Sequence, residues 1–178
     1  MTDIAEPDPT TPAPTTPERI FLPEDAQMPN HPDLPVLFYR GVLAGDAAGD
    51  LAEAFEARFS ASGWGGTWRN GIYRFHHFHP DAHEALGVAR GHARVRLGGE
   101  SGQDLAIEAG DLVVLPAGTG HKLVDASPDF LVVGAYPPGQ EDFETLREAI
   151  PRDRLRAVAR PTTDPVHGEG GPLVLLWG

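Results

Sequence analysis

The stretch that decides the fold is HHFHPDAHE at residues 76–84, where histidines gather just before a glutamate. On an extended strand alternate side chains share a face, so His77 and His79 are expected to point the same way. After a short turn, Glu84 opens the next strand and can come alongside them as a carboxylate. Much later in the chain, His121 follows a glycine-rich turn and starts another strand. The pattern predicts one metal site whose ligands are His77, His79, Glu84 and His121.

The remaining histidines fit this site less well. The same alternation places His76 and His83 on the outside, in surface roles or in roles beside the ligands. His31, His92 and His167 match no ligand geometry. We expect none of these five side chains to bind the metal.

The composition limits the ligand chemistry. The chain has 178 residues and no cysteine, so thiolate metal sites, disulfides and cysteine nucleophiles are excluded. Any metal must therefore use histidine or carboxylate ligands. Three neutral imidazoles and one carboxylate suit one divalent transition metal ion, namely Fe, Mn, Ni, Co or Zn.

Charge and hydropathy narrow the partners. Lys and Arg number 14 against 26 Asp and Glu, and this net charge of -12 repels a phosphate backbone. The longest apolar stretch, Phe130–Tyr136, is far shorter than the ~20 residues that span a bilayer, and the N-terminus lacks the basic and apolar regions of a secretory signal. We expect a small-molecule ligand, no nucleic-acid or membrane partner, and a cytoplasmic location.

The apolar pattern predicts an all-β protein with one or two peripheral helices. Leu51, Phe55 and Phe59 recur at the helical period, which indicates one helix that begins at the N-cap Asp46, ends at Gly63 and packs on a sheet. A short second helix is expected over 141–149. Short strands bounded by turn residues are expected over 34–39, 67–69, 72–79, 84–89, 93–97, 105–108, 112–115, 121–125, 130–136 and 173–177.

The first part of the chain differs from the rest in composition. Residues 1–17 alternate proline and threonine with acids and carry almost no large apolar side chains. Such a segment buries too little apolar surface to offset the entropy of ordering it. We predict a flexible arm over residues 1–20 and a single domain over 21–178, with the metal-binding core at about 66–136.

The motif spacing resembles that of the cupins. Gly71-x5-His77-x-His79-x4-Glu84-x6-Gly91 is similar to the first cupin motif, and Gly110-x5-Pro116-x-Gly118-x2-His121 to most of the second, with Asp125 where Asn is usual. Further runs at 83–91, 131–140 and 164–168 resemble the YjlB-like small single-domain bacterial cupins. The resemblance implies a double-stranded β-helix, the cupin jelly-roll barrel, with the metal inside it.

Two classes of function fit these residues. The first is a metal-dependent enzyme of dioxygenase or isomerase type that acts on a small organic molecule, with Tyr73 and Trp68 as candidate substrate-binding residues. The second is a non-catalytic module that binds or senses a small metabolite. A metal-free epimerase with a His and Tyr acid–base pair is a third reading. A pocket of ~300 Å³ or more above the metal distinguishes an enzyme from a closed structural site.

A homodimer is also expected from the apolar pattern. An outward-pointing Phe78, the helix stripe and the apolar segment 173–177 together offer more apolar surface than one small barrel readily hides. Pairing of two sheet faces would cover that surface and protect the strand edges.

Overall fold

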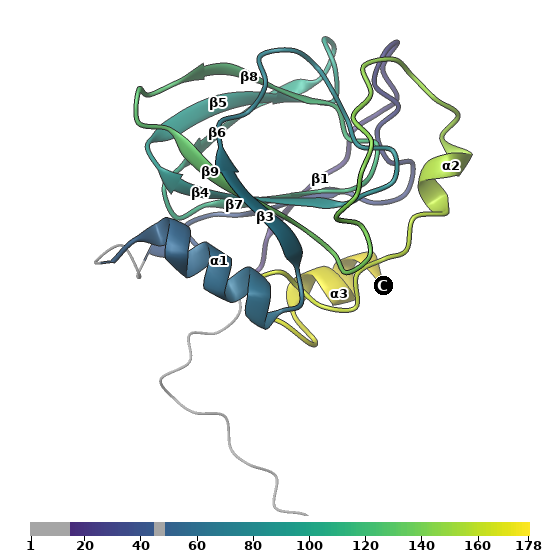
Figure 1. Ribbon diagram of the computed structural model, residues 1–178. Coiled ribbons are helices and arrows are strands. Elements are labelled where there is room, and N and C mark those ends of the chain that lie inside the picture. Colours follow the sequence, from purple (N-terminus) through teal and green to yellow (C-terminus); the bar gives the residue numbers. More distant parts are fainter. Residues whose placement is uncertain (1–14, 45–48) are drawn as a thin grey trace, which may run out of the picture.

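The computed structural model describes residues 15–44 and 49–178, and it has two facing antiparallel sheets with the two longer helices on the outer side of the larger sheet (Figure 1). The larger sheet has the strand order β1-β2-β7-β4-β9-β3, made of β1 Glu18–Ile20, β2 Val36–Tyr39, β7 Leu112–Leu115, β4 Glu84–Arg90, β9 Leu131–Tyr136 and β3 Gly65–Asn70. The smaller sheet has the order β6-β5-β8, made of β6 Gln103–Glu108, β5 His92–Leu97 and β8 His121–Ala126. This is a double-stranded β-helix whose sheets face each other without closing into one barrel, and it confirms the predicted fold class.

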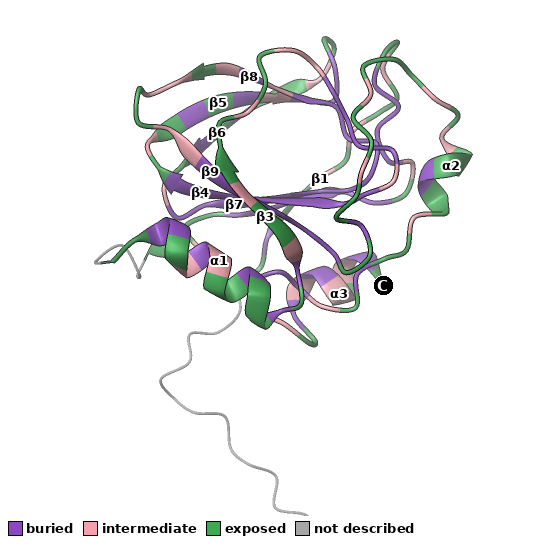
Figure 2. Ribbon diagram, viewed as in Figure 1, coloured by how far each residue is buried: buried purple, intermediate pink, exposed green. Residues whose placement is uncertain are grey.

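The middle strands of the larger sheet have apolar residues on both faces, because both faces are covered. On β4, Leu86 and Val88 point between the two sheets, whereas Ala85 and Ala89 point toward the helices. Figure 2 shows these central strands buried along most of their length. Glu84 has the same parity as Leu86 and Val88, so the strand directs a carboxylate into the space between the sheets.

The predicted long helix is α1, Leu51–Ala61, and it lies on the outer face of the larger sheet (Figure 1). The side chain of Asp50 caps it by accepting from the backbone N–H of Ala52 at 2.9 Å. The predicted cap, Asp46, lies outside the described residues. Phe55 packs on β4 at Gly87, where an added Cβ would overlap its ring. The absence of a side chain at Gly87 therefore lets the helix approach the sheet closely.

Three predicted elements are wrong. Residues 72–79 form a loop rather than a regular strand. Within this loop, His77 makes an isolated bridge to β8 and Phe78 makes one to Leu146. Residues 141–149 form no helix, because that segment is extended enough to pair with Phe78. Residues 173–177 lie in a helix, α3, Pro172–Trp177, and a short helix α2 spans Asp153–Arg156.

The helical start of α3 has two local causes. Pro172 stands at its first turn, where the missing N–H costs nothing, and the buried Asp164 accepts from the backbone N–H of Leu173 at 3.0 Å. Leu173 and Trp177 are buried one turn apart, whereas Leu175 between them is 77% exposed. That spacing is helical. It could not be recognised in the sequence, because nearly every residue of this segment is apolar.

The apolar surface expected to drive dimer formation is buried within the chain. Phe78, Phe55 and Trp177 are all packed in the interior. The homodimer stays a prediction, but these side chains no longer support it. Glu18–Ile20 form β1, which pairs with β2, so these three residues assigned to the arm belong to the sheet. Residues 1–14 lie outside the described part of the chain, and no helix of the described part is long and apolar enough to cross a membrane.

We predict that Phe55→Ala lowers the free energy of unfolding by about 3–5 kcal/mol, because it empties the contact between α1 and β4. Phe21→Ala is the matched control: its side chain is 65% exposed, and we expect a change within ~0.5 kcal/mol. Urea unfolding of both variants measures the difference. Equal losses in the two variants would show that α1 does not stabilise the sheet.

Candidate metal centre

Three histidines meet in the space between the sheets. His77 and His79 come from the loop that precedes β4, and His121 is the first residue of β8. Backbone bonds hold the loop in place: His77 and His121 exchange N–H to carbonyl bonds of 3.0 and 3.3 Å, and the His79 carbonyl accepts from Gly118 N–H at 2.8 Å. The potential ligand atoms of the three side chains all lie within 4.8 Å of one another, and all three residues are buried.

The hydrogen bonds of the imidazoles determine which nitrogen of each ring is free. Each Nδ1 lies against a backbone carbonyl oxygen: His77 on Phe75 at 3.1 Å, His79 on Glu144 at 2.8 Å and His121 on Thr119 at 3.0 Å. A carbonyl oxygen only accepts, so every Nδ1 carries the hydrogen and donates it. In the neutral rings each Nε2 therefore presents a lone pair to the centre of the cluster, which is the form that binds a metal.

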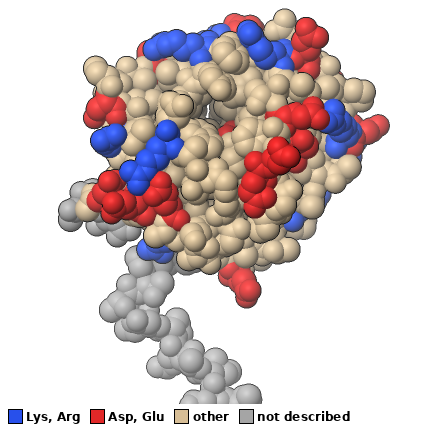
Figure 3. Space-filling view, in the orientation of Figure 1, with Lys and Arg blue, Asp and Glu red and all other residues tan. Residues whose placement is uncertain are grey.

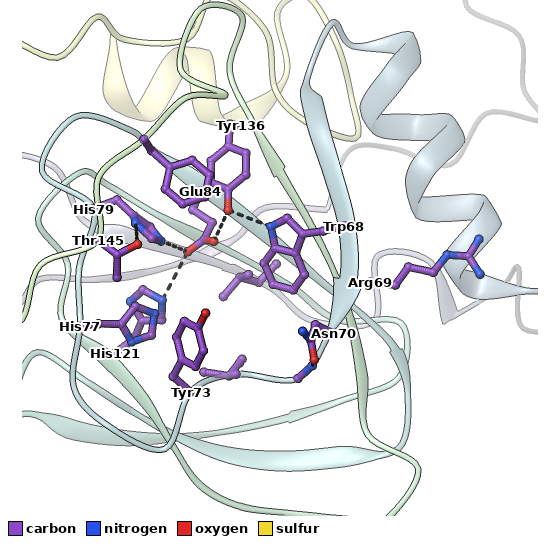
Figure 4. Close-up of a pocket in the computed structure, with 14 residues that line it drawn as sticks. Trp68, Arg69, Asn70, Tyr73, His77, His79, Glu84, His121, Tyr136 and Thr145 are labelled. Carbon is purple, nitrogen blue, oxygen red and sulfur yellow. Dashed lines mark hydrogen bonds and ion pairs between the residues drawn. The ribbon is translucent and has the colours of Figure 1, made fainter.

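Glu84 completes the cluster. Its Oε2 atom lies 3.4 Å from His79 Nε2 and 3.3 Å from His121 Nε2. This oxygen is buried and has no hydrogen-bond partner in the part of the chain that the structure describes. The other oxygen, Oε1, accepts from the hydroxyl of Tyr136 at 2.9 Å. Figure 4 shows the carboxylate between the histidines on one side and Tyr136 on the other.

The charges of the cluster are strongly coupled. Burial raises the pKa of Glu84, but attraction to His79 and the close approach of the His121 and His79 rings outweigh burial and hold that pKa well below its usual value. Burial opposes a charge on His79 as well, yet attraction to Glu84 and the bonds it makes raise the His79 pKa. Burial, followed by repulsion from His121, lowers the pKa of His77 to about 3.

These observations test whether the residues fit a metal ion, and they do. A buried carboxylate oxygen faces imidazole lone pairs, and such an arrangement is repulsive unless a cation stands between them. Three Nε2 atoms and one carboxylate oxygen are also a donor set that divalent transition metals accept. The residues predicted as ligands are thus the ones that the fold brings together.

A cavity of about 350 Å³ opens beside this cluster. Its walls combine aromatic and aliphatic side chains with the histidines, Glu84 and other polar groups. Figure 3 shows this face of the molecule hollowed, with acidic side chains gathered along one side of the hollow. The main wall residues besides the histidines and Glu84 are Trp68, Ile72, Tyr73, Leu86, Tyr136 and Phe143.

Both predicted substrate-binding residues line the cavity, in different ways. Tyr73 is 58% exposed, its ring stacks on Phe75 at 4.8 Å, and its hydroxyl has no hydrogen-bond partner among residues 15–44 and 49–178. In Figure 4 that hydroxyl points toward the cavity. Trp68 lines the wall with its ring, but its Nε1 donates to the Tyr136 hydroxyl at 2.8 Å. Arg69 points away from the cavity and pairs with Glu56 at 2.7 Å.

Two sequence expectations about neighbouring histidines need correction. His83 was expected on the outside, but it is fully buried and its Nδ1 accepts from Ala117 N–H at 2.9 Å. The cause is the loop before β4, whose path does not follow strand alternation. The His76 side chain is only 8% exposed and contacts Glu100 at 3.1 Å. Neither residue belongs to the three-histidine cluster.

The sequence reading missed Tyr136 and Phe143. Tyr136 ends β9, far from the histidine motif in sequence. The Phe143 ring packs on Tyr136, with 4.2 Å between ring centroids, and meets the His79 ring edge-to-face at 4.5 Å. The only signal for Tyr136 is its even spacing from Val132 and Gly134 on one strand, which places it on the inner face. No local pattern marks Phe143.

The sheet pair and the buried histidine cluster define a cupin, and the comparisons with known proteins agree. Residues 69–133 match the family model of the cupin domain. The chain is 40% identical over 164 residues to the uncharacterized protein YjlB of Bacillus subtilis, and the match covers 88% of this chain and 94% of YjlB. The chain therefore belongs to the cupin family, in the group that includes YjlB.

Among solved structures, the chain is similar to a conserved protein with a double-stranded β-helix domain from Klebsiella pneumoniae. The identity is 16% and the TM-score 0.38, covering 79% of this chain and 90% of that one. It is also similar to acireductone dioxygenase from Bacillus anthracis, with 19% identity and a TM-score of 0.34, covering 48% of this chain and 57% of that one.

We predict that metal binding releases protons below the pKa of His79. That pKa is raised, so the metal-free site holds its proton up to and above the usual His value, and a metal must displace it. Affinity for Co²⁺ should fall about tenfold per pH unit below the His79 pKa, with about one proton released per ion. Calorimetry in buffers of different ionisation enthalpy measures the release. An affinity that stays constant from pH 8 to pH 5 would contradict histidine ligation.

Proposed function

We propose that the protein binds one divalent transition metal ion per chain and uses it to act on a small organic substrate. The ligands are Nε2 of His77, His79 and His121 and Oε2 of Glu84. The observation that carries this proposal is the buried, unpartnered Oε2 of Glu84, which lies beside the imidazole nitrogens at 3.3 and 3.4 Å. The ion is Fe, Mn, Ni, Co or Zn, because all of these accept imidazole and carboxylate together.

The cavity supports an enzyme over a structural metal site. A structural ion is enclosed by its ligands, whereas an enzyme keeps open positions and space above them. The cavity of about 350 Å³ borders all four proposed ligands and is large enough for a small organic molecule. When bound, the metal supplies Lewis acidity, or in the case of iron the ability to activate dioxygen, which fits dioxygenase- or isomerase-type chemistry.

The side chains of the cavity divide the remaining tasks. Tyr73 has the free hydroxyl, so it orients a substrate oxygen or gives it a proton. The ring of Trp68 and the ring of Phe143 provide apolar surface that excludes water from a bound substrate. Tyr136 serves neither task, because its hydroxyl hydrogen is committed to Glu84.

A matched set of variants tests the metal centre. We expect protein purified without a histidine tag, and reloaded after metal removal, to contain about one equivalent of metal. His121→Ala and His79→Ala should each weaken binding at least ~100-fold, because each removes a ligand from the buried donor set. His92→Ala is the control: this exposed histidine lies outside the cluster, and its metal content should equal that of the wild type.

Elemental analysis and a thermal-shift screen supply the readouts. A small organic ligand that uses the open metal positions should raise the melting temperature of the loaded wild type and leave that of His121→Ala unchanged. Turnover of such a ligand marks an enzyme, and tight binding without turnover marks a sensing or storage module. Far less than one equivalent of metal after reloading, or equal loss in His92→Ala, would contradict the proposal.

A further inference from the structure

A directed chain of two hydrogen bonds ends on Glu84. Trp68 Nε1 donates to the Tyr136 hydroxyl oxygen at 2.8 Å, and the Tyr136 hydroxyl donates to Glu84 Oε1 at 2.9 Å (Figure 4). An indole nitrogen only donates and an ionised carboxylate only accepts, so the direction of both bonds is fixed. All three side chains come from neighbouring strands of the larger sheet, β3, β9 and β4.

This chain separates the two oxygens of Glu84. Oε1 is occupied by Tyr136, whereas Oε2 is buried without a hydrogen bond and faces His79 and His121. We infer that Trp68 and Tyr136 are positioning residues that make Glu84 bind the metal through one oxygen only. The inference rests on the proposed metal centre and adds to it two residues that are not themselves ligands.

The position of Trp68 is itself built into the sheet. Trp68 pairs with Gly134 on β9, and Gly134 pairs in turn with Leu86 on β4. A Cβ atom at Gly134 would overlap the indole ring, so the ring occupies the space that a side chain would fill. Strand register and one missing side chain therefore set the indole N–H over the Tyr136 hydroxyl.

The two hydrogen bonds that end on Glu84 affect how many coordination positions of the metal stay open. A carboxylate held by one oxygen uses one coordination position, so the other positions stay available to a ligand in the cavity. Because the Trp68 N–H and the Tyr136 O–H are already used in these two hydrogen bonds, neither is available to donate to that ligand. Tyr73 then carries the phenol that remains free in this wall of the cavity.

Co²⁺ binding to variants of the full chain tests the inference, because the visible spectrum of Co²⁺ reports its coordination number. Tyr136→Phe should weaken Co²⁺ binding about 10–100-fold, because Glu84 loses the residue that orients it. The spectrum should also change, since Glu84 is then free to bind through both oxygens. Trp68→Phe should change both in the same direction by a smaller factor. In the Tyr136→Phe background, Trp68→Phe should have no further effect, because Trp68 acts through Tyr136.

The protein offers two matched control residues outside the cavity. Tyr39 donates to the buried carboxylate of Asp164, as Tyr136 does to Glu84, and Trp64 Nε1 donates to the Thr163 carbonyl. Tyr39→Phe and Trp64→Phe lose hydrogen bonds of the same kinds, so they should lower the melting temperature without changing Co²⁺ affinity or its spectrum. If Tyr136→Phe does not fold, Trp68→Phe and Gly134→Ala, which both keep Tyr136, must still shift the spectrum.

The outcomes separate this inference from the metal centre. Wild-type protein that binds no Co²⁺ would overturn both. Tight wild-type binding would support the centre, and Tyr136→Phe or Trp68→Phe with wild-type affinity and spectrum would then overturn the positioning roles alone. Additive effects of the two substitutions would also overturn the proposed role of Trp68, since they would show that Trp68 acts independently of Tyr136.

Discussion

The arrangement of the histidine cluster depends on one buried carboxylate oxygen. Glu84 Oε2 has no hydrogen-bond partner among the described residues, and it faces imidazole nitrogens whose hydrogens point away from it. Leaving such a charge unpaired in the interior costs several kcal/mol, so the site requires a cation. In the proposed metal centre, a proton on His79 or a divalent ion would meet this need. In the proposed centre, proton and metal would therefore compete for the same place.

The scaffold holds this oxygen through its most central strand. Glu84 opens β4, which lies between β7 and β9 in the larger sheet and carries α1 on its outer face. Phe55 packs closely against Gly87 and holds that strand from the helix side of the sheet. The Tyr136 hydroxyl holds the carboxylate through a hydrogen bond to Oε1. The histidines are held differently: His77 and His79 lie in a loop that is bonded to β8 and to backbone carbonyls. A rigid strand thus supplies the charge, and an anchored loop supplies most of the nitrogens.

Short-range periodicity could predict a β-rich fold and the shared face of His77 and His79, whereas the double-stranded β-helix and the meeting of His121 with the other three residues followed from the resemblance to the two cupin motifs. His77 and His79 share a face even though their segment is a loop, and Glu84 keeps its parity on β4. Tyr136 could not be found in this way, since its contact with Glu84 depends on the register between β9 and β4. The exposure of Phe78 was predicted wrongly for a similar reason: the segment around Leu146 covers it, and no local pattern indicates that pairing.

Anomalous diffraction at the absorption edge of a bound metal tests the central claim most directly. Crystals of reloaded protein should give one strong peak per chain, ~2.0–2.2 Å from Nε2 of His77, His79 and His121 and from Oε2 of Glu84. Glu84 Oε1 should remain on the Tyr136 hydroxyl. No peak in this cluster, or a peak beyond the reach of Glu84 Oε2, would contradict the account, because the buried carboxylate would then need another explanation.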